Sequence, residues 1–282
     1  MPNAAPSMVV KFYGTRGSIP VCSKDFLEFG GNTSCVAIDL PDKNVLNIID
    51  AGSGIRTLGQ ELMAEGAKFP EEMTIGFTHF HWDHIQGFPF FPPAYMSDLK
   101  INLLMMGRNS DFDRLKKILF DQMGGAFFPI AMGDMGANFN FISMKHKVTQ
   151  NSTGMSVVAR VHSHPGGALS YRIERNGKVL VISTDIEHGE TIDQRIVELA
   201  RDADLLIHEA QYTTEELVGK EGWGHSSYRQ AIQVAQMANV KQLIMTHHDP
   251  SHNDYFLARK EIECQKVFPN SLLAREGMVI EL

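Results

Sequence analysis

The pattern of apolar and polar positions along the chain predicts alternating strands and helices, as in a protein of the α/β class. Short apolar runs rich in β-branched residues predict strands at residues 8–13, 35–40, 45–49, 73–78, 99–106, 156–163, 169–174, 178–183, 204–207, 242–245 and 278–282. Amphipathic stretches predict helices at residues 55–64, 111–123, 190–200 and 253–267, and another whose apolar face contains Ala231, Val234, Ala235 and Ala238. The order strand-rich, helical, strand-rich, helical indicates two similar halves, which we expect to form a single domain over residues 1–282.

Turn residues between these segments refine the prediction. Asn176-Gly177 joins two predicted strands and is the strongest short signal for a hairpin. The glycines of residues 50–54 either cradle a phosphate or let a strand turn sharply into a helix, and glycine spacing alone does not decide between these roles. Residues 124–136 are rich in glycine and form a candidate lid. The aromatic residues 88–95 either pack in the core or form a pocket wall together with that lid.

Composition limits the class of protein. Of the 282 residues, 43% are hydrophobic and 21% are charged, which is typical of a soluble globular protein. The formal net charge of −7 argues against a large nucleic-acid interface, because such an interface usually carries a basic patch. The 3 cysteines are widely spaced and favour reduced thiols over a disulfide framework. No apolar run approaches the roughly 20 residues of a membrane helix. We therefore expect a cytoplasmic protein without a membrane partner.

The densest group of reactive side chains follows the strand predicted at residues 73–78. His79, His81, Asp83 and His84 occur there within six positions. In an extended chain, His79 and His81 leave the same face and can bind one ion, whereas Asp83 and His84 follow a turn and can bind a second ion. Imidazole and carboxylate ligands suit zinc, manganese or iron. A histidine-rich surface loop is rarely this dense, so we interpret the stretch as a metal site.

The second half of the chain contains further ligand candidates, most of them just after a predicted strand. They are His162, His164, Asp185, His208, Glu209, His225, His247 and His248. The folds of α/β proteins bring the carboxyl ends of their strands to one edge, where their chemistry lies. We therefore expect these groups to meet residues 79–84 at that edge.

These residues carry a resemblance to a known family. The pattern His79-x-His81-x-Asp83-His84, followed by His164, Asp185 and His247, resembles the binuclear metal set of the metallo-β-lactamase superfamily. The resemblance implies a four-layer αββα sandwich with two metal ions at one edge of its two sheets. Within the superfamily, the chain is most similar to the phosphodiesterase branch around tRNase Z and the phosphonate-pathway cyclic phosphodiesterases. The motifs that carry this likeness are Gly14-Thr-Arg-Gly-Ser18, Asn32-Thr-Ser34, Asp50-Ala-Gly52, Tyr171, His208-Glu209-Ala210, Gly224-His225-Ser226 and Leu243-Ile-Met-Thr-His247.

The resemblance also implies a role for each residue. The first ion would be held by His79, His81 and His164. The second ion would be held by Asp83, His84 and His247, with Asp185 bridging the two. The catalytic residues would be Asp83, His225 and Glu209, of which His225, supported by Glu209, would serve the leaving oxygen. Two divalent ions are thus implied, zinc first and manganese or iron as alternatives.

General chemistry is consistent with these roles. Two dications against two carboxylates leave a net positive site that attracts an anionic substrate. A hydroxide shared by the ions can exist near neutral pH, because one bound Zn²⁺ already lowers the pKa of its water to roughly 7. Two ions about 4 Å apart can stabilise both the attacking and the departing oxygen of an in-line displacement. A further histidine suits the role of general acid.

Two histidine doublets leave the choice of ligand open. Spacing alone does not separate His162 from His164, or His247 from His248. The resemblance selects His164 by its spacing of seven residues from Tyr171 in the sequence. It selects His247 because this residue directly follows a predicted strand and a threonine. His162 and His248 are then expected to support the ligands or to pack.

The expected function is hydrolysis of a small phosphodiester, including cyclic ones. In tRNase Z, an arm that grips the tRNA is inserted between the third metal histidine and the bridging aspartate, whereas here His164 and Asp185 enclose only a tight hairpin. The alternatives are a di-iron protein that senses or binds oxygen, and a thioester or lactone hydrolase.

Ser170, at a position where the family has glycine, is expected to change only a backbone detail. Because His84 replaces the arginine of lactam-cleaving relatives, we do not expect β-lactamase activity. A homodimer is one of the assemblies left open.

Overall fold

The first sheet contains seven strands in the order β14-β1-β2-β3-β4-β5-β6. The computed structural model describes residues 5–106, 109–144, 147–148 and 151–282. The strands of this sheet are β1 (Val9–Gly14), β2 (Cys35–Leu40), β3 (Val45–Ile49), β4 (Glu72–Gly76), β5 (Lys100–Met106), β6 (Asn138–Met144) and β14 (Val279–Glu281). Strands β14, β1, β2 and β3 pair antiparallel, and β3 to β6 pair parallel.

The second sheet repeats this plan, with seven strands in the order β13-β12-β11-β10-β9-β8-β7. Its strands are β7 (Lys147–Val148), β8 (Ser156–His162), β9 (Ala168–Arg175), β10 (Lys178–Ser183), β11 (Leu205–Glu209), β12 (Gln242–Thr246) and β13 (Ser271–Leu273). The predicted hairpin is confirmed, because Arg175 pairs with Lys178 across the turn of β9 and β10. Asn176 and Gly177 both have positive φ, which residues of these two types adopt readily.

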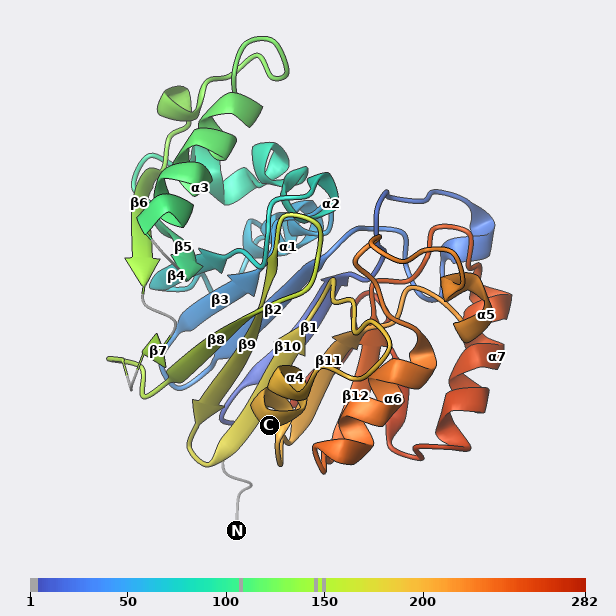
Figure 1. Ribbon diagram of the computed structural model, residues 1–282. Helices are drawn as coiled ribbons and strands as arrows, with labels where there is room; N and C mark the ends of the chain where they lie inside the picture. The colour runs from blue at the N-terminus through green and yellow to red at the C-terminus, as the bar shows by residue number, and fades with distance from the viewer. Residues whose placement is uncertain (1–4, 107–108, 145–146, 149–150) are drawn as a thin grey trace.

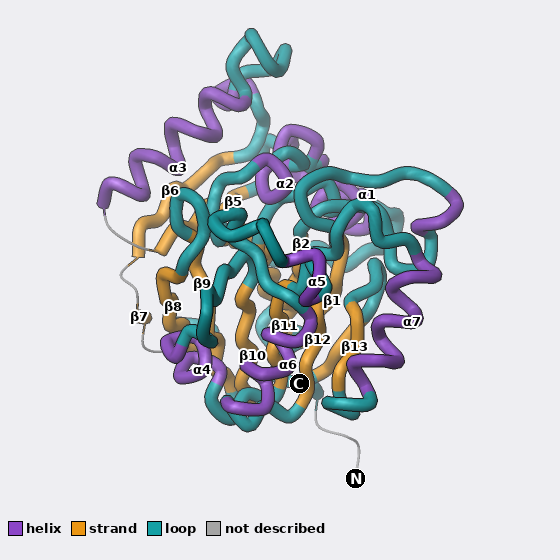
Figure 2. The backbone as a smooth tube through the Cα atoms, turned by 45° about the vertical axis from the view of Figure 1, so that its right-hand side comes forward, coloured by secondary structure: helices purple, strands orange, loops and turns teal. Residues whose placement is uncertain are grey.

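Helices cover the outer face of each sheet (Figure 1). They are α1 (Ile55–Leu62), α2 (Trp82–Ile85), α3 (Asn109–Gln122), α4 (Gln194–Ala200), α5 (Thr214–Leu217), α6 (Tyr228–Met237) and α7 (Asp254–Gln265). Short 3₁₀ turns are η1 (Lys24–Phe26), η2 (Phe88–Phe90), η3 (Pro92–Tyr95) and η4 (Met132–Asp134). Helices α1 and α3 contact the first sheet, and α4, α6 and α7 contact the second. Figure 2 shows α3 and the loop after it projecting from the rest of the molecule.

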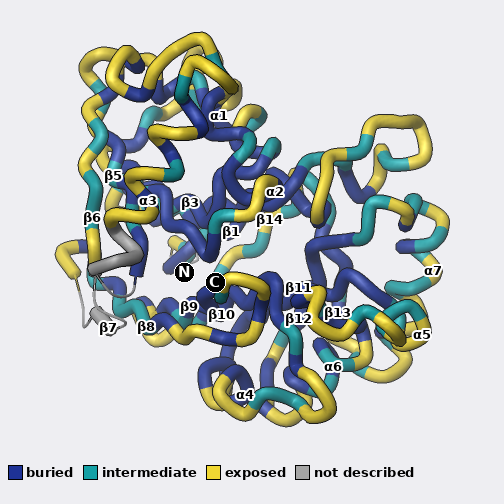
Figure 3. The backbone as a smooth tube through the Cα atoms, turned by 45° about the horizontal axis from the view of Figure 1, so that its top comes forward, coloured by how far each residue is buried: buried dark blue, intermediate teal, exposed yellow. Residues whose placement is uncertain are grey.

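Two apolar clusters hold these layers together. One joins residues of both sheets, such as Phe12 and Ile38 with Leu180 and Ile207, and extends to α1 and α3 on the first sheet. The other lies between the second sheet and its helices. Figure 3 shows the buried positions along the strands and the exposed ones on the outer surfaces of the helices. The predicted four-layer αββα sandwich is therefore confirmed. Among the described residues, no helix has the length and apolarity needed to cross a bilayer.

The structure differs from the prediction in a few elements. Strands β6, β7 and β13 are not predicted, and β7 and β13 have only 2 and 3 residues, too few to produce a hydrophobic pattern. The helix predicted over residues 190–200 begins only at Gln194, because the Asp193 side chain accepts a hydrogen bond from the Arg195 amide and caps it there. In residues 88–95, Phe88 and Phe91 are fully buried, which agrees with the core-packing alternative for these two, whereas Phe90 and Tyr95 are exposed.

Candidate metal centre

The candidate residues lie where strands of both sheets end. Strand β4 ends at Gly76, and the chain then bends at Thr78. His81, which precedes helix α2, has an extended backbone (φ −66°, ψ 155°). Asp83 and His84 are buried within that helix. The turn between strand and helix is the one that the sequence predicts, and it lets the two pairs of side chains approach from different directions.

Ligand-type atoms gather here in two adjacent groups, and the atoms of each group lie within 4.8 Å of one another. The first group is His79, His81 and His164. The second group is Asp83, His84, Asp185 and His247. Asp185 also groups with His164 and His225, which places its carboxylate between the two sets. The structure thus brings together all seven residues predicted as ligands.

Asp185 is the most central acid. Its Oδ1 lies 3.2 Å from His247 Nε2 and 3.9 Å from His79 Nε2. Its Oδ2 lies 3.1 Å from His84 Nε2. One carboxylate therefore faces histidines of both groups, as a bridging ligand would.

Burial and neighbouring charges control protonation in this cluster. Burial raises the pKa of the Asp185 carboxyl, but the histidines around it, led by His247, hold that pKa well below its ordinary value. Burial and the nearby His84 lower the pKa of His79 well below its ordinary value. Although burial lowers the pKa of His84, Asp185 and Asp83 raise it well above its ordinary value, a sign of concentrated negative charge. Ionised carboxylates and neutral imidazoles are the forms that bind metal ions.

Unpartnered atoms at this centre fit metal ions. The buried Nε2 of His79 has no hydrogen-bond partner among the residues that the structure describes. Oδ2 of Asp185 likewise makes no aligned hydrogen bond within them, despite its proximity to His84. Buried polar atoms are nearly always satisfied in folded proteins. A cation between these nitrogen and oxygen atoms would satisfy them, and the donor set suits a divalent ion such as zinc.

The structure distinguishes the two histidines of the first doublet, His162 and His164. His164 Nε2 lies 2.9 Å from His81 Nδ1, inside the first group. His162 points away, because its Nε2 lies 3.2 Å from the Asp185 backbone oxygen and its Nδ1 lies 2.9 Å from Ser170 Oγ. The expectation that Ser170 changes only a backbone detail is wrong, since its hydroxyl also lies 2.7 Å from Ser183 Oγ and holds His162 in the core.

The second doublet separates in the same way. His247 Nε2 lies 3.0 Å from Asp83 Oδ2, and its Nδ1 lies 3.0 Å from Gln211 Oε1. His248 instead directs its Nε2 to the Ala274 backbone oxygen at 2.9 Å. The geometry therefore places His247 among the ligand candidates of the second group and His248 in the core.

His225 and Glu209 lie beside this centre. His225 Nδ1 is 3.6 Å from Glu209 Oε1 and 3.9 Å from Asp185 Oδ1. The ring of His225 stacks on that of His247, with centroids 5.2 Å apart. Glu209 is fully buried and accepts hydrogen bonds from the backbone amides of Ile186, Gln211 and Ser226. The sequence predicts Glu209 as a support for His225, and these bonds also show it fixing the loops around that histidine.

Sequence reasoning missed Asp50, which orients the second group. Its Oδ2 lies 2.8 Å from His84 Nδ1, and its two oxygens accept hydrogen bonds from the Thr78 amide and hydroxyl. This contact turns His84 Nε2 toward the centre, as supporting carboxylates do in metal sites. An acid directly after a predicted strand, as at Asp185, is the signal that could have identified it. Gln211, which contacts His247, has no comparable signal.

The glycine-rich motifs allow close packing around the histidines. A Cβ at Gly17 would lie 2.4 Å from the His247 ring, and one at Gly224 would lie 2.1 Å from His164 Nδ1. In the loop at residues 50–54, a Cβ at Gly52 would lie 2.2 Å from the Asp83 backbone oxygen. These contacts favour the structural role of that loop over a phosphate cradle.

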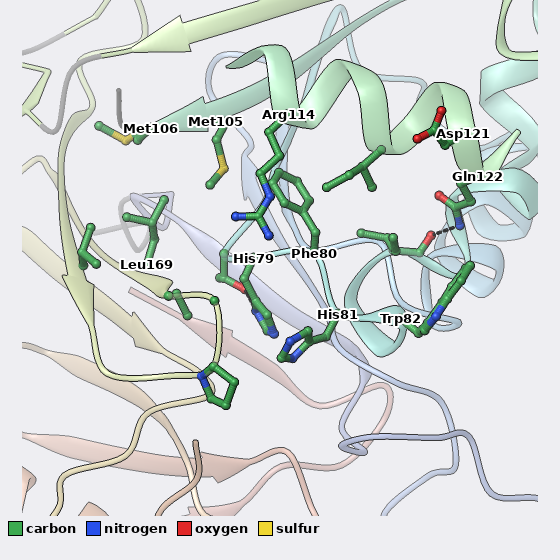
Figure 4. A pocket seen from close by; sticks show the side chains of 18 of the residues that line it. His79, Phe80, His81, Trp82, Met105, Met106, Arg114, Asp121, Gln122 and Leu169 are labelled. Carbon is green, nitrogen blue, oxygen red and sulfur yellow. Dashed lines mark hydrogen bonds between the residues drawn. The ribbon is translucent and has the colours of Figure 1, made fainter. Parts of the chain in front are cut away.

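A cavity of about 660 Å³ opens beside the first group (Figure 4). His79, Phe80 and His81 form one side, and residues 165–169 after His164 form another. Of the candidate lid at residues 124–136, Phe127 lines the cavity. The aromatic residues 88–95 do not line it, so the prediction that they form its wall is wrong.

Known proteins are similar to this chain in sequence and in fold. The family described as "Beta-lactamase superfamily domain" matches residues 46–248. The chain is 26% identical to a protein named Ribonuclease Z from Synechocystis, over 98% of this chain and 94% of that one. It is similar in structure to the metallo-β-lactamase fold protein YhfI from Bacillus subtilis (TM-score 0.70, 18% identity, 97% of this chain and 99% of that one). It is also similar to the short form of human tRNase Z (TM-score 0.67, 19% identity, 97% of this chain and 98% of that one).

The relatives' names do not support the expectation of a small substrate without a nucleic-acid partner, because "Ribonuclease Z" and "tRNase Z" describe enzymes that act on RNA. The implied superfamily, by contrast, is confirmed. The family match spans most of the chain and includes His79, Asp185 and His247. The chain belongs to the beta-lactamase superfamily and has the metallo-β-lactamase fold.

Proposed function

We propose that this protein is a metal-dependent phosphodiesterase with two metal ions. One observation carries the proposal: seven ligand-type side chains from both halves of the chain converge in two groups, and His225 stands beside them with Glu209. The names of the relatives agree with hydrolysis of a phosphodiester bond.

In this proposal each group holds one divalent ion. The ligands of the first ion are His79, His81 and His164. The ligands of the second ion are Asp83, His84 and His247. The bridging position of Asp185 between the two groups supports its assignment to both ions. Zinc is the proposed metal, because the donor set of imidazole nitrogens and carboxylate oxygens is typical of zinc sites.

The chain's own residues then divide the chemistry. When bound, the two ions supply Lewis acidity and a water-derived nucleophile at neutral pH. Asp83 and Asp185 keep the nearby imidazoles oriented toward the centre. The two carboxylates do not neutralise the charge of two dications, so the site stays net positive and attracts an anionic phosphodiester. His225 donates a proton to the departing oxygen, which lowers the barrier for a poor leaving group. Glu209 supports His225 as the neighbouring carboxylate, with Oε1 3.6 Å from His225 Nδ1 and no aligned hydrogen bond between these two atoms.

Metal analysis together with a phosphodiesterase assay tests this function. Protein purified without chelator should contain two ions per chain and hydrolyse bis(p-nitrophenyl) phosphate. Removal of the metal should abolish the activity, and added zinc should restore it. A coloured, oxygen-dependent spectrum without hydrolysis would instead indicate a di-iron sensor. Hydrolysis of thioesters or lactones in preference to phosphodiesters would instead indicate a thioester or lactone hydrolase.

We further propose that the substrate is a small phosphodiester. The support is the segment between His164 and Asp185, which forms the β9–β10 hairpin with a tight turn at Asn176-Gly177 and leaves no room for an RNA-gripping arm. The test is a competition at physiological salt between precursor tRNA and small cyclic or aryl phosphodiesters. Preferred cleavage of the precursor tRNA would overturn the small-substrate proposal and leave the phosphodiesterase intact.

A further inference from the structure

The cavity beside the first metal group has mostly apolar walls. It is lined by Met105 of β5, Ile118 of α3, Leu169 of β9 and the loop residue Phe127. His79 and His81 of the first group also line it. Its volume of about 660 Å³ falls in the range of small-molecule sites. A substrate bound at the metal centre would therefore have room to place one of its substituents here.

Arg114 brings a positive charge to this cavity. It lines the cavity from α3, and Figure 4 shows its guanidinium reaching down beside Phe80 towards His79. The guanidinium carbon lies 5.7 Å from the centre of the Phe80 ring. Its Nη2 lies 3.9 Å from where a Cβ would stand on Gly166. Phe80 separates His79 from His81 in the chain, and Gly166 lies two residues after His164, so the cation borders both segments that supply the first group.

This guanidinium has no polar partner in the described part of the chain. No hydrogen bond or ion pair joins it to any residue there, although the acid Asp121 also lines the cavity. Asp121 is instead paired with Lys117, one turn earlier in the same helix. A guanidinium offers five donors in a planar fork that matches the oxygens of a phosphate. Its donors therefore remain available to a ligand in the cavity.

We propose that Arg114 binds a second phosphate group of the substrate, separated from the scissile phosphodiester by an apolar or ring-containing unit that packs in the cavity. This inference rests on the proposed phosphodiesterase function and specifies its substrate class. The second phosphate is either a terminal phosphate monoester or the next link of an oligonucleotide. Both sources present the same oxygens to the guanidinium, and both place an apolar face, such as a base, against Met105 and Leu169.

The hydrolysis test compares substrates that share a scissile bond. The metal-loaded full chain is assayed with the dinucleotide ApA, with pApA and ApAp, which add a terminal phosphate, and with ApApA, which adds an internal link. Losing a charge-assisted, bidentate contact should reduce binding by about tenfold to a hundredfold. Arg114→Gln should therefore lower kcat/KM by that factor for the phosphate-bearing substrate that wild type prefers. It should leave ApA and bis(p-nitrophenyl) phosphate unchanged.

Lys116→Gln is the matched control, because Lys116 is an exposed cation of the same helix and does not line the cavity. This variant should retain the wild-type preference, whereas Arg114→Lys should retain only part of it. Preference for pApA or ApAp over ApApA would identify a terminal phosphate, and the reverse would identify an internal link. Equal rates on all four substrates in wild type, or equal losses on all four in Arg114→Gln, would overturn the inference.

A binding measurement separates this inference from the proposed function. Calorimetric titration of metal-loaded protein uses adenosine 5′-monophosphate and adenosine 3′,5′-bisphosphate as probes. Wild type should bind the bisphosphate more tightly by at least about tenfold, and Arg114→Gln should bind both probes equally. If no phosphodiester is hydrolysed but this difference in affinity is found, the proposed function fails and the second-phosphate site stands. Equal affinities in wild type would remove the site, whatever the activity.

Discussion

Several residues of the metal centre adopt backbone conformations that are unusual for their type. Ser18, Asp50, Asp185 and His247 have φ between 54° and 64°. Residues with a Cβ enter this region at an energetic cost, and such residues cluster at functional sites where surrounding contacts hold them. The contacts are visible here: the Ser18 amide donates to Asp83 Oδ2 at 2.7 Å, and Asp50 binds Thr78. The fold thus holds these side chains in place before any ligand arrives.

Replacing Asp185 tests the bridging assignment. Asp185→Asn keeps a residue that tolerates positive φ but removes the charge that faces both groups. We expect metal analysis to give fewer than two ions per chain and the assay to show almost no phosphodiesterase activity. Asp202→Asn is the matched control, because Asp202 is exposed and has the same φ of 54°. Two ions per chain in Asp185→Asn would contradict the bridging role.

His225 should act on the leaving group and not on the metals. His225→Ala should retain both ions and lower kcat by roughly 10²–10⁴ on substrates with a poor leaving group, the usual scale for general acid catalysis. The loss should be much smaller with p-nitrophenolate, which departs without a proton. The comparison requires kcat for an alkyl and an aryl phosphodiester. Equal losses of kcat on the alkyl and the aryl phosphodiester would contradict the general-acid role and indicate that His225 only positions the substrate.

Asp50 should act chiefly on the ion that His84 binds, because the carboxylate contacts the His84 ring directly and reaches His79 only through Thr78. In Asp50→Asn the carboxylate that faces His84 Nδ1 is lost, and contacts of this kind typically contribute 10–100-fold to metal affinity. The variant should lose affinity for one ion by about this factor and keep the other unchanged, as measured by competition with a chelator. Equal weakening of both ions would show that Asp50 supports the whole fold and not this ligand.

The contrast between Asp50 and Asp185 shows what the sequence reveals about the site. The dense stretch from His79 to His84 and the family motifs are enough to predict which side chains gather at the candidate centre, because residue type and spacing are properties of sequence. Asp50 and Gln211 act by contacts between segments distant in the chain, and these appear only after folding. The same holds for Arg114, which no motif marks and which reaches the cavity because α3 packs against β5.

Among the elements, strand β9 links the two sheets close to the metal centre. The Tyr171 hydroxyl of β9 donates to the Phe77 backbone oxygen, just after β4, at 2.5 Å. The Leu169 amide, also in β9, donates to the Thr78 oxygen at 3.0 Å. The elements themselves are well predicted where the apolar pattern is long, as in β2, β3 and β10. Pairing across the sheets leaves no periodic signal and could not be predicted.

Removing the Tyr171 hydroxyl tests this link. Tyr171→Phe leaves the buried Phe77 carbonyl without its partner, which should reduce the free energy of unfolding by about 1–3 kcal/mol. The measurement is denaturant unfolding of metal-free protein, so that metal binding does not contribute. Tyr255→Phe is the control, because Tyr255 is 71% exposed. Equal stabilities for the two variants would show that the hydroxyl does not strengthen the contact between the sheets.

At the scale of the whole molecule, the metal centre is shared between the two halves. His79, His81, Asp83 and His84 follow β4 of the first sheet. His164, Asp185 and His247 follow β8, β10 and β12 of the second. The sequence predicts the two halves from its repeated order of elements, and the structure shows that each proposed ion would draw ligands from both. Metal binding should therefore stabilise the contact between the sheets as well as supply the chemistry.

Metal removal should consequently destabilise the entire fold. An ion that binds only the folded state stabilises it by about 2.7 kcal/mol when its free concentration is 100 times its Kd. Calorimetry should show a lower Tm after chelation and a full recovery with added zinc. Because the first ion takes ligands from both halves, His79→Gln and His164→Gln should each remove most of the stabilisation that this ion provides. A Tm independent of metal would mean that the two halves hold together without the ions, and that the centre serves chemistry alone.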